Sequence, residues 1–231
     1  MNNIIAIIPA RSGSKSIKNK NLQVINGKSL LQRAVEFALK IENISKVIVS
    51  TDSIKYQKLA ISYGAECPFL RPKKISGDTS FDIDVFKHCL NWMSENQKFY
   101  PDIVINMRPT YPFREIKDFN YAIKKISNNK TIDSIKSVCK IPFPLEKTWT
   151  IKNKFYLQNS IYKNFDKEYW NMPRQKLKQY YVQNGNIDIL RASLILKNKM
   201  SGKKIFTIVQ DHFYDIDSIK DIKNARKFKN I

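Results

Sequence analysis

The stretch Ile4–Asn21 reads IIAIIPARSGSKSIKNKN and decides the fold class. Its first part, Ile4–Ile8, is an apolar run of strand length. A loop of small residues follows it and carries spaced cations, among them Arg11, Lys15 and Lys20. In α/β proteins such a loop holds phosphate groups, because small residues leave backbone N–H groups accessible and cations neutralise phosphate charge. Open α/β sheets bind ligands at the carboxyl ends of their strands. The stretch therefore predicts an enzyme that handles a nucleoside triphosphate.

This loop belongs to neither of the two commonest nucleotide-binding patterns. It lacks the G-x-x-x-x-G-K-[ST] spacing of a Walker loop and the G-x-G-x-x-G spacing of a dinucleotide fold. The sequence thus argues against an ordinary kinase, ATPase or dehydrogenase.

Apolar runs of strand length alternate with amphipathic helical patterns over the first 140 residues and again near the C-terminus. The predicted strands are Ile4–Ile8, Lys46–Ser50, Glu66–Leu70, Asp102–Met107, Asp133–Val138, Gly185–Leu190 and Lys204–Val209. The predicted helices are Ser29–Lys40, Ile54–Tyr63, Asp78–Met93, Ile116–Ile126, Ala192–Leu196 and Ser218–Phe228. This rhythm predicts an α/β protein with a mainly parallel sheet covered by helices on both faces.

The chain is strongly basic, with 41 Lys and Arg against 20 Asp and Glu and a formal net charge of +21 over 231 residues. Such a charge raises the possibility of nucleic-acid binding. The lysines are scattered rather than gathered in one block, however, and no recognition motif for nucleic acid is present. We therefore expect an anionic small-molecule substrate and no nucleic-acid partner.

Three cysteines and the absence of long apolar runs bear on location. Cys67, Cys89 and Cys139 are odd in number and widely spaced, so neither a metal pattern nor a disulfide framework fits them. No apolar run is long enough for a membrane helix, and the first residues do not resemble a signal peptide. We expect a cytoplasmic protein that does not enter a membrane.

Residues 141–182 interrupt the regular pattern. They are rich in Pro, Lys and Asn, have poor periodicity, and contain Trp149, Trp170 and five of the eleven tyrosines. A stretch this aromatic is too apolar for a disordered linker. It predicts either a partner-binding arm or a cover for the substrate.

Two further motifs carry chemistry. Asp215-Ile216-Asp217 follows a strand-like run, and carboxylates at positions i and i+2 of an extended segment point to the same side, where they could hold one Mg²⁺. The alternative is that Asp217 and Ser218 only cap the last helix. The second motif, Arg108–Arg114, is a proline-stiffened loop whose two arginines are candidates for a carboxylate or phosphate partner.

Taken together, these motifs resemble the acylneuraminate cytidylyltransferase family, which comprises the CMP-sialic acid synthetases and their legionaminate and pseudaminate relatives. The family pattern I-[PA]-A-R-x-G-S-K-G-[IL]-P-x-K-N is similar to residues 8–21. The resemblance continues in order through Val47–Asp52, Arg71-Pro72, Asp78-Thr79-Ser80, Arg108–Arg114, Asn184-Gly185 and Asp215-Ile216-Asp217.

This resemblance implies a Rossmann-like nucleotide-diphospho-sugar transferase fold in three parts. Residues 1–140 would form the nucleotide-binding core, 141–182 a dimerisation excursion that covers the sugar, and 183–231 the remainder of the core with a metal site. The protein would be a homodimer in which the excursion of one copy reaches the active site of the other.

The resemblance also implies a role for each site residue. The phosphates of CTP would be held by Arg11, Lys15 and Lys20. Other nucleotide contacts would come from Ala10, Asn21, Arg71, Ser80 and Asp82, the last three in the cytosine pocket. The sugar acid would meet Arg108, Thr110, Asn184, Lys147 and Arg174. Mg²⁺ would be carried by Asp215 and Asp217, and Asp217 or a metal-bound water would accept the proton.

The implied reaction is attack by the anomeric hydroxyl of a 2-keto-3-deoxy sugar acid on the α-phosphorus of CTP, which gives a CMP-sugar and pyrophosphate. Intact cations and carboxylates argue against a member without catalysis. The sugar-side positions depart from the family pattern at Arg108, Tyr111 and Asp188, and the base pocket departs at Asp82. In the first loop, Ser16 and Lys18 replace a glycine and a proline. These departures predict retained nucleotidyl transfer to an altered acidic nine-carbon sugar. The alternatives are the same fold acting on 3-deoxy-octulosonate, or a basic nucleic-acid-binding protein.

Overall fold

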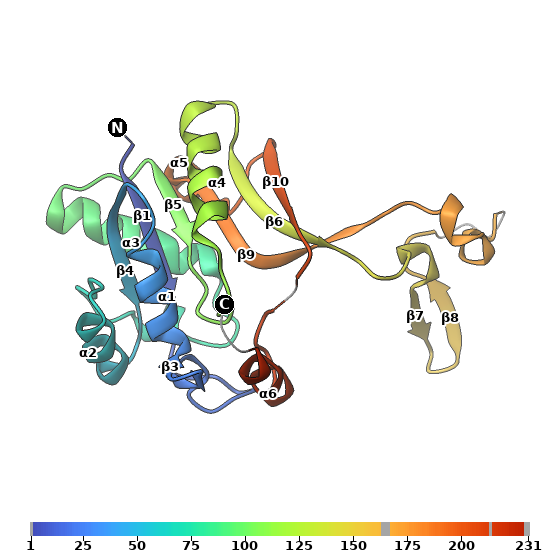
Figure 1. Cartoon of the computed structure of the whole chain (residues 1–231), viewed down its shortest axis with the longest axis horizontal. Helices are drawn as coiled ribbons and strands as arrows, with labels where there is room; N and C mark the ends of the chain where they lie inside the picture. Colours follow the sequence, from blue (N-terminus) through green and yellow to red (C-terminus); the bar gives the residue numbers. More distant parts are fainter. Residues whose placement is uncertain (1, 163–166, 213, 229–231) are drawn as a thin grey trace.

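A six-stranded sheet in the order β10-β6-β9-β5-β1-β4 forms the centre of the computed structural model, which describes residues 2–162, 167–212 and 214–228 (Figure 1). Its strands are β1 (Ile4–Pro9), β4 (Ile44–Ser50), β5 (Ile103–Asn106), β6 (Ser134–Lys140), β9 (Tyr181–Arg191) and β10 (Ile205–Gln210). Strand β9 is antiparallel to its neighbours β5 and β6, and the other pairs are parallel. The predicted α/β class with a mainly parallel mixed sheet is confirmed.

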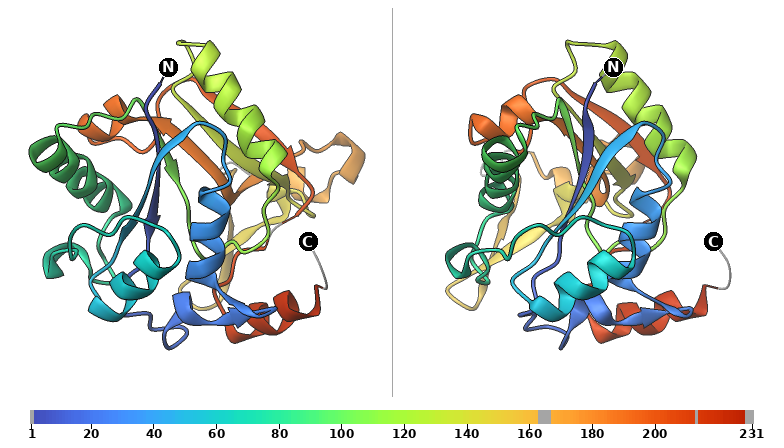
Figure 2. Two further views of the ribbon diagram at one scale, coloured as in Figure 1. Left: turned by 60° about the vertical axis from the view of Figure 1, so that its left-hand side comes forward. Right: turned by 90° about the vertical axis from the view of Figure 1, so that its left-hand side faces the viewer.

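Helices cover both faces of this sheet. One face carries α1 (Leu30–Ala38), α2 (Ile54–Ser62) and α4 (Ile116–Asn128), and the other carries α3 (Asp82–Gln97) and α5 (Ala192–Leu196). The right-hand view of Figure 2 shows α3 and α4 on opposite sides of the sheet. Because side chains alternate along β1, Ile4, Ala6 and Ile8 join one apolar core while Ile5 and Ile7 join the other. This double burial explains why the strand is apolar throughout.

Serine side chains and a glycine stabilise several helix ends. The hydroxyl of Ser29 accepts a hydrogen bond from the Gln32 amide at the start of α1, and Ser53 does the same for Tyr56 in α2. Gly64, just beyond α2, has a φ of +96°, a conformation that glycine adopts without a Cβ penalty. At the C-terminus, Ser218 and Asp221 form a reciprocal capping box on α6 (Ile219–Lys227).

Two predicted elements are wrong. Glu66–Leu70 is not a strand, because Glu66 forms only a single bridge with Ile48 and Pro68 supplies no N–H to continue a ladder. The third long helix begins at Asp82 rather than at Asp78. The Asp78 carboxylate does not cap a helix because it is bound by two cations, described below.

The aromatic excursion forms an arm that extends away from the sheet (Figure 1). Strands β6 and β9 pair out to Lys140 and Tyr181, so the arm begins and ends on two hydrogen-bonded strands. Beyond them lies a hairpin that the sequence did not predict, formed by β7 (Trp149–Lys152) and β8 (Tyr156–Asn159). The described part of the arm also contains three 3₁₀ turns: η3 (Leu145–Lys147), η4 (Tyr169–Asn171) and η5 (Arg174–Lys176). Residues 163–166 of the predicted excursion lie outside the described residues, as do 213 and 229–231 of the predicted C-terminal part.

Small elements below the sheet position the first loop. The turn η1 (Lys20–Leu22) and the hairpin β2 (Val24–Ile25) and β3 (Lys28–Ser29) connect that loop to α1. An apolar cluster that includes Ile17, Ile25 and Ile216 joins these elements to the segment before α6. The η2 turn (Lys73–Ile75) lies in the loop that leads to α3. In the part of the chain that the structure describes, no helix combines the length and apolarity needed to cross a membrane.

Candidate active site

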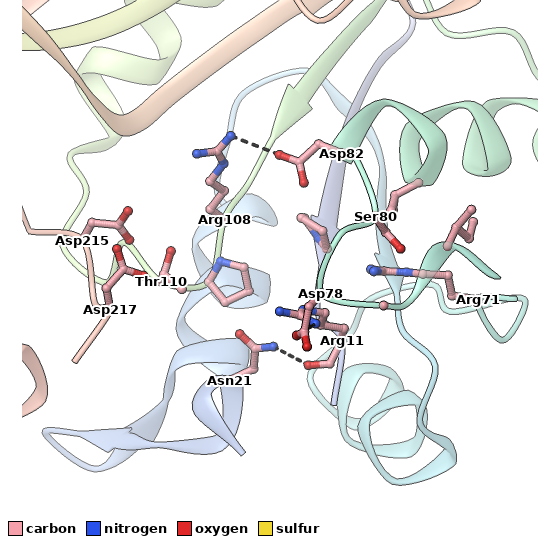
Figure 3. Close-up of a pocket in the computed structure, with 15 residues that line it drawn as sticks. Arg11, Asn21, Arg71, Asp78, Ser80, Asp82, Arg108, Thr110, Asp215 and Asp217 are labelled. Carbon is pink, nitrogen blue, oxygen red and sulfur yellow. Dashed lines mark hydrogen bonds and ion pairs between the residues drawn. The ribbon is translucent and has the colours of Figure 1, made fainter. Parts of the chain in front are cut away.

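A pocket of about 360 Å³ opens at the carboxyl ends of β1 and β5. Nine of the residues predicted for the site line it: Arg11, Asn21, Arg71, Ser80, Asp82, Arg108, Thr110, Asp215 and Asp217. In Figure 3, Asp215 and Asp217 lie on one side, Arg71 and Ser80 lie on the other, and Arg11 is between them. Residues more than 200 positions apart in the chain therefore share one cavity.

The loop after β1 is held by side chains on both of its sides. The buried Asn21 amide donates to the Arg11 carbonyl at 3.0 Å. On the other side, Asp52 accepts hydrogen bonds from the Ser12 amide at 2.8 Å and the Ser12 hydroxyl at 3.1 Å. The loop is thus fixed before any ligand binds, and its cation Arg11 faces the pocket.

Both leading cations of this loop bind the same carboxylate. Arg11 Nη1 lies 2.6 Å from Asp78 Oδ1, and Lys15 Nζ lies 2.7 Å from Asp78 Oδ2. Hydrogen bonds from Lys15 and Arg11 lower the pKa of Asp78, so this carboxyl is ionised at neutral pH. Asp78 therefore occupies the cations that a phosphate chain would use.

Arg71 and Ser80 form the opposite wall. Arg71 is buried, and its Nε donates to the Ser50 hydroxyl at 3.1 Å. Burial lowers the pKa of Arg71, yet a guanidinium stays charged in proteins. The resemblance places Asp82 in the cytosine pocket. In the structure its carboxylate accepts a hydrogen bond from Arg108 Nη2 at 3.1 Å.

The two C-terminal carboxylates reach the pocket because of one backbone hydrogen bond. The Ile216 amide donates to the Thr110 carbonyl at 2.9 Å, which holds the segment beside the β5 loop and directs Asp215 and Asp217 into the cavity. The helix cap is Ser218, so the alternative in which Asp217 only caps is wrong. Asp217 Oδ1 instead pairs with Lys20 Nζ at 3.0 Å.

This carboxylate pair suits a magnesium ion. Asp215 Oδ1 is a buried oxygen without a hydrogen-bond partner among the described residues, a costly state unless a cation or proton satisfies it. Mg²⁺ is bound in proteins through one or two carboxylates together with substrate phosphates. Within residues 2–162, 167–212 and 214–228, no group of three or more His, Cys, Asp or Glu side chains is placed to hold a metal ion. Phosphate oxygens of the substrate would therefore have to complete the coordination at Asp215 and Asp217.

Gly185 separates Arg108 from Asp215. Its φ is +76°, and a Cβ there would lie 3.8 Å from Arg108 Nη1 and 4.0 Å from Asp215 Oδ2. These distances are ordinary contacts, so the backbone conformation is what favours glycine.

We expect Gly185→Ala to destabilise the protein by about 1–2 kcal/mol, because an L side chain is unfavourable in the left-handed region. Urea unfolding would measure the loss. Gly13→Ala is the matched control, since its added Cβ meets nothing within 4 Å and its φ is not in that region. Equal stability of the two variants would contradict the expectation.

Six predicted site residues do not line the pocket. Lys15 and Lys20 reach it through their partners, Asp78 and Asp217. Ala10 lies in the core, with its amide bound to the Ser50 carbonyl at 2.9 Å, and Asn184 is buried against Gln210 and the His212 carbonyl. The other two are on the arm, Lys147 in η3 and Arg174 in η5, where Arg174 donates to the Pro142 carbonyl. The arm extends away from the central sheet (Figure 1), and no residue of the arm lines the pocket.

Sequence reasoning missed the partners of three carboxylates in or near this site. Asp52 and Asp78 were assigned only to family motifs, Asp78 also to the start of a helix, and Asp188 only to a departure from the family pattern. Nothing local shows that Ser12 will bind Asp52, or that distant cations will bind Asp78 and Asp188. A count of cations in the first loop was the one available signal, because clustered cations require counter-charges.

Relatives of this chain carry cytidylyltransferase names. It is 32% identical over 225 residues to the N-acylneuraminate cytidylyltransferase of Escherichia coli, covering 96% of this chain and 51% of that protein. It is 31% identical over 205 residues to the CMP-N,N'-diacetyllegionaminic acid synthase of Legionella pneumophila, covering 85% of this chain and 81% of that protein. The chain thus spans about half the length of the Escherichia coli relative.

Solved structures show the same fold. A CMP:2-keto-3-deoxy-manno-octonic acid synthetase complexed with CTP superimposes with a TM-score of 0.68 at 18% identity, covering 97% of each chain. A pattern described as cytidylyltransferase matches residues 5–230. With its motifs, fold and pocket in agreement with that match, this chain belongs to the cytidylyltransferase family.

Proposed function

We propose that this protein couples CTP to a sialic acid-like nonulosonate, a 2-keto-3-deoxy sugar acid, and releases pyrophosphate. The observation that carries the proposal is the meeting of the β1 loop cation Arg11 with Asp215 and Asp217 in one pocket. Relatives named for sialic and legionaminic acid substrates support the class of acceptor.

The reaction needs charge neutralisation more than covalent catalysis. The anomeric oxygen of the acid forms a bond to the α-phosphorus of CTP, the bond from that phosphorus to the bridging oxygen breaks, and pyrophosphate leaves with the bond's electron pair. Arg11, Lys15 and Lys20 would bind the phosphates and offset the charge that develops on the leaving group. For this they must exchange Asp78 and Asp217 for phosphate oxygens.

A magnesium ion would be held by Asp215 and Asp217, and would supply positive charge to the triphosphate. The hydroxyl proton of the acceptor needs a base. Asp217 or a water held by that ion is our candidate, since the Asp217 side chain is 76% exposed and would lose its partner Lys20 to phosphate.

On the sugar side, Arg108 and Thr110 line the pocket next to the carboxylate pair. Lys147 and Arg174 would complete the sugar site from a second copy of the chain, because neither lines the pocket of its own chain and the arm that carries them extends away from the central sheet (Figure 1).

We propose that the arm makes the protein a homodimer. Its hairpin exposes large apolar side chains, with Phe155 83%, Ile151 70% and Tyr156 70% exposed. Apolar groups gathered at this density are typical of an interaction surface.

Phe155→Asp combined with Ile151→Asp is expected to give a monomer that binds CTP but no longer turns over the acid. Light scattering would measure the mass, and calorimetry would measure CTP uptake. Ile61→Asp is the matched control, because Ile61 is 54% exposed on α2 and lies outside the arm. A double variant that stays dimeric, or a monomer with full turnover, would contradict the proposal.

The proposed function is tested by pyrophosphate release from CTP with a panel of acids. We expect release with at least one nine-carbon acid and Mg²⁺, and little with 3-deoxy-octulosonate. Faster release with the octulosonate would overturn the choice of acceptor. Tight binding of random RNA at physiological salt, without protection from heat by CTP, would favour the nucleic-acid alternative instead.

We also propose a reducing, cytoplasmic location. The three cysteines are buried and unpaired, and burial raises the pKa of Cys67 to about 11, so this thiol stays neutral and unreactive.

A further inference from the structure

The middle of β9 carries a buried carboxylate that none of the roles above explains. Asp188 is 1% exposed and lies just outside the pocket. Lys136 Nζ, from β6, lies 2.7 Å from Asp188 Oδ1, and Asn106 Nδ2, at the end of β5, donates to Oδ2 at 3.1 Å. Both neighbouring strands thus hold this side chain in place.

The third neighbour of Asp188 is Arg108, which lines the pocket. Arg108 Nη2 lies 4.0 Å from Asp188 Oδ2 and 3.1 Å from Asp82 Oδ2. The two carboxylates therefore face the same nitrogen. Nη1 has no hydrogen-bond partner among the described residues. In Figure 3 the guanidinium reaches Asp82 through one terminal nitrogen, and its other terminal nitrogen lies on the side of Asp215.

The side chains of Asp82 and Asp188 differ in how freely they can move. The Asp82 side chain is 45% exposed at the start of α3 and can move, whereas the Asp188 side chain is 2% exposed and enclosed by the sheet. A buried carboxylate keeps its charge only where cations and donors surround it. Lys136 and Asn106 provide them, so Asp188 presents a fixed negative charge to Arg108.

We propose that Asp188 is a positioning residue for acceptor binding. Its fixed charge attracts Arg108 Nη2 across 4.0 Å and limits the orientations of the guanidinium, so that Nη1 is left to receive the carboxylate of the sugar acid. A long side chain that is already ordered loses less freedom when the ligand binds, which improves affinity. This inference rests on the proposed function. Within that function, Arg108 recognises the acid group, Asp188 orients Arg108, and Lys136 keeps Asp188 charged.

Asp188→Asn alone is an incomplete test. It leaves the Lys136 ammonium, whose side chain is only 16% exposed, without its counter-charge, and the protein would lose stability for that reason. The double variant Asp188→Asn with Lys136→Met removes both charges. It separates support of the fold from positioning of Arg108.

In the double variant we expect thermal stability close to that of the wild type, but a KM for the sugar acid raised about fivefold to tenfold. The KM for CTP and kcat should stay within about twofold, because Arg108 contacts only the acceptor. The matched control is Lys46→Met with Glu66→Gln. It removes another partly buried ion pair, at residues that do not line the pocket, so the KM for the acid should change by less than about twofold.

Two results would overturn the inference. One is a double variant with the wild-type KM for the acid, which would leave Asp188 a purely structural role. The other is an equal rise in the KM values for CTP and acid, which would mean a general disturbance of the pocket.

Failure of the proposed function is seen separately, as a wild-type protein that releases no pyrophosphate with any acid. In that case a crystal structure of the double variant decides the positioning claim. Arg108 should leave the orientation it has here, and an unchanged Arg108 would refute it.

Discussion

Asp215→Asn is expected to lower turnover by about 10²–10³-fold while leaving the fold intact. The loss of one preorganised charge at a developing negative charge has effects of this size. An asparagine keeps the shape of the side chain but removes the anionic oxygen that is now buried without a partner. The measurement is kcat for pyrophosphate release at saturating CTP, with circular dichroism as a check of folding.

Asp221→Asn is the control for this variant, since Asp221 lies in the same segment but faces the helix cap. It should cost about 1 kcal/mol of stability, as the loss of a cap does, with turnover unchanged. Asp217→Asn should resemble Asp215→Asn in abolishing turnover. Unchanged turnover of both site variants would remove the magnesium assignment.

Arg11→Gln is expected to lower kcat/KM for CTP by about 10²-fold. Arg11 is the leading cation of a loop whose backbone is fixed by Asn21 and Asp52, so no other side chain can move into its place. Charge-assisted bonds to phosphate are about twice as strong as neutral ones, and glutamine keeps only the neutral donor. Steady-state kinetics with varied CTP would measure the effect.

Asp78→Asn should act in the opposite direction and lower the KM for CTP a few-fold. Asp78 competes with phosphate for Arg11 and Lys15, and a neutral amide competes less well. Because these cations lower its pKa, Asp78 stays charged from neutral pH down to below the ordinary carboxyl value of about 4. Its stabilising contribution is present above that value and is lost as the pH falls through the lowered one. An Asp78→Asn variant with a higher KM for CTP would show that the carboxylate supports nucleotide binding instead.

The predictable part of this protein is the part encoded locally. Ile4–Pro9 forms β1 because its residues are apolar at every position, and the small residues after it can only form a loop. Ser53 and Ser218 stand at the starts of predicted helices and cap them, since a cap depends on neighbours three residues away. The arm was visible as a change of composition, although its hairpin was not.

Contacts between distant segments could not be predicted in the same way. Asp78 stands at the start of a predicted helix, but its carboxylate forms ion pairs with Arg11 and Lys15, which lie more than 60 residues earlier in the chain. Asp188 stands in a predicted strand and departs from the family pattern, but nothing local shows that β5 and β6 will enclose its side chain.

By itself, the sequence determined the α/β class, the helix caps, the phosphate-type loop and the family, because each depends on residue type and short spacing. Only the tertiary structure decided which charges face one another, since an ion pair depends on distance in space. The hydrogen bond from Ile216 to Thr110 brings the carboxylate pair to the Arg11 loop, and the sheet order brings Asp188 beneath Arg108.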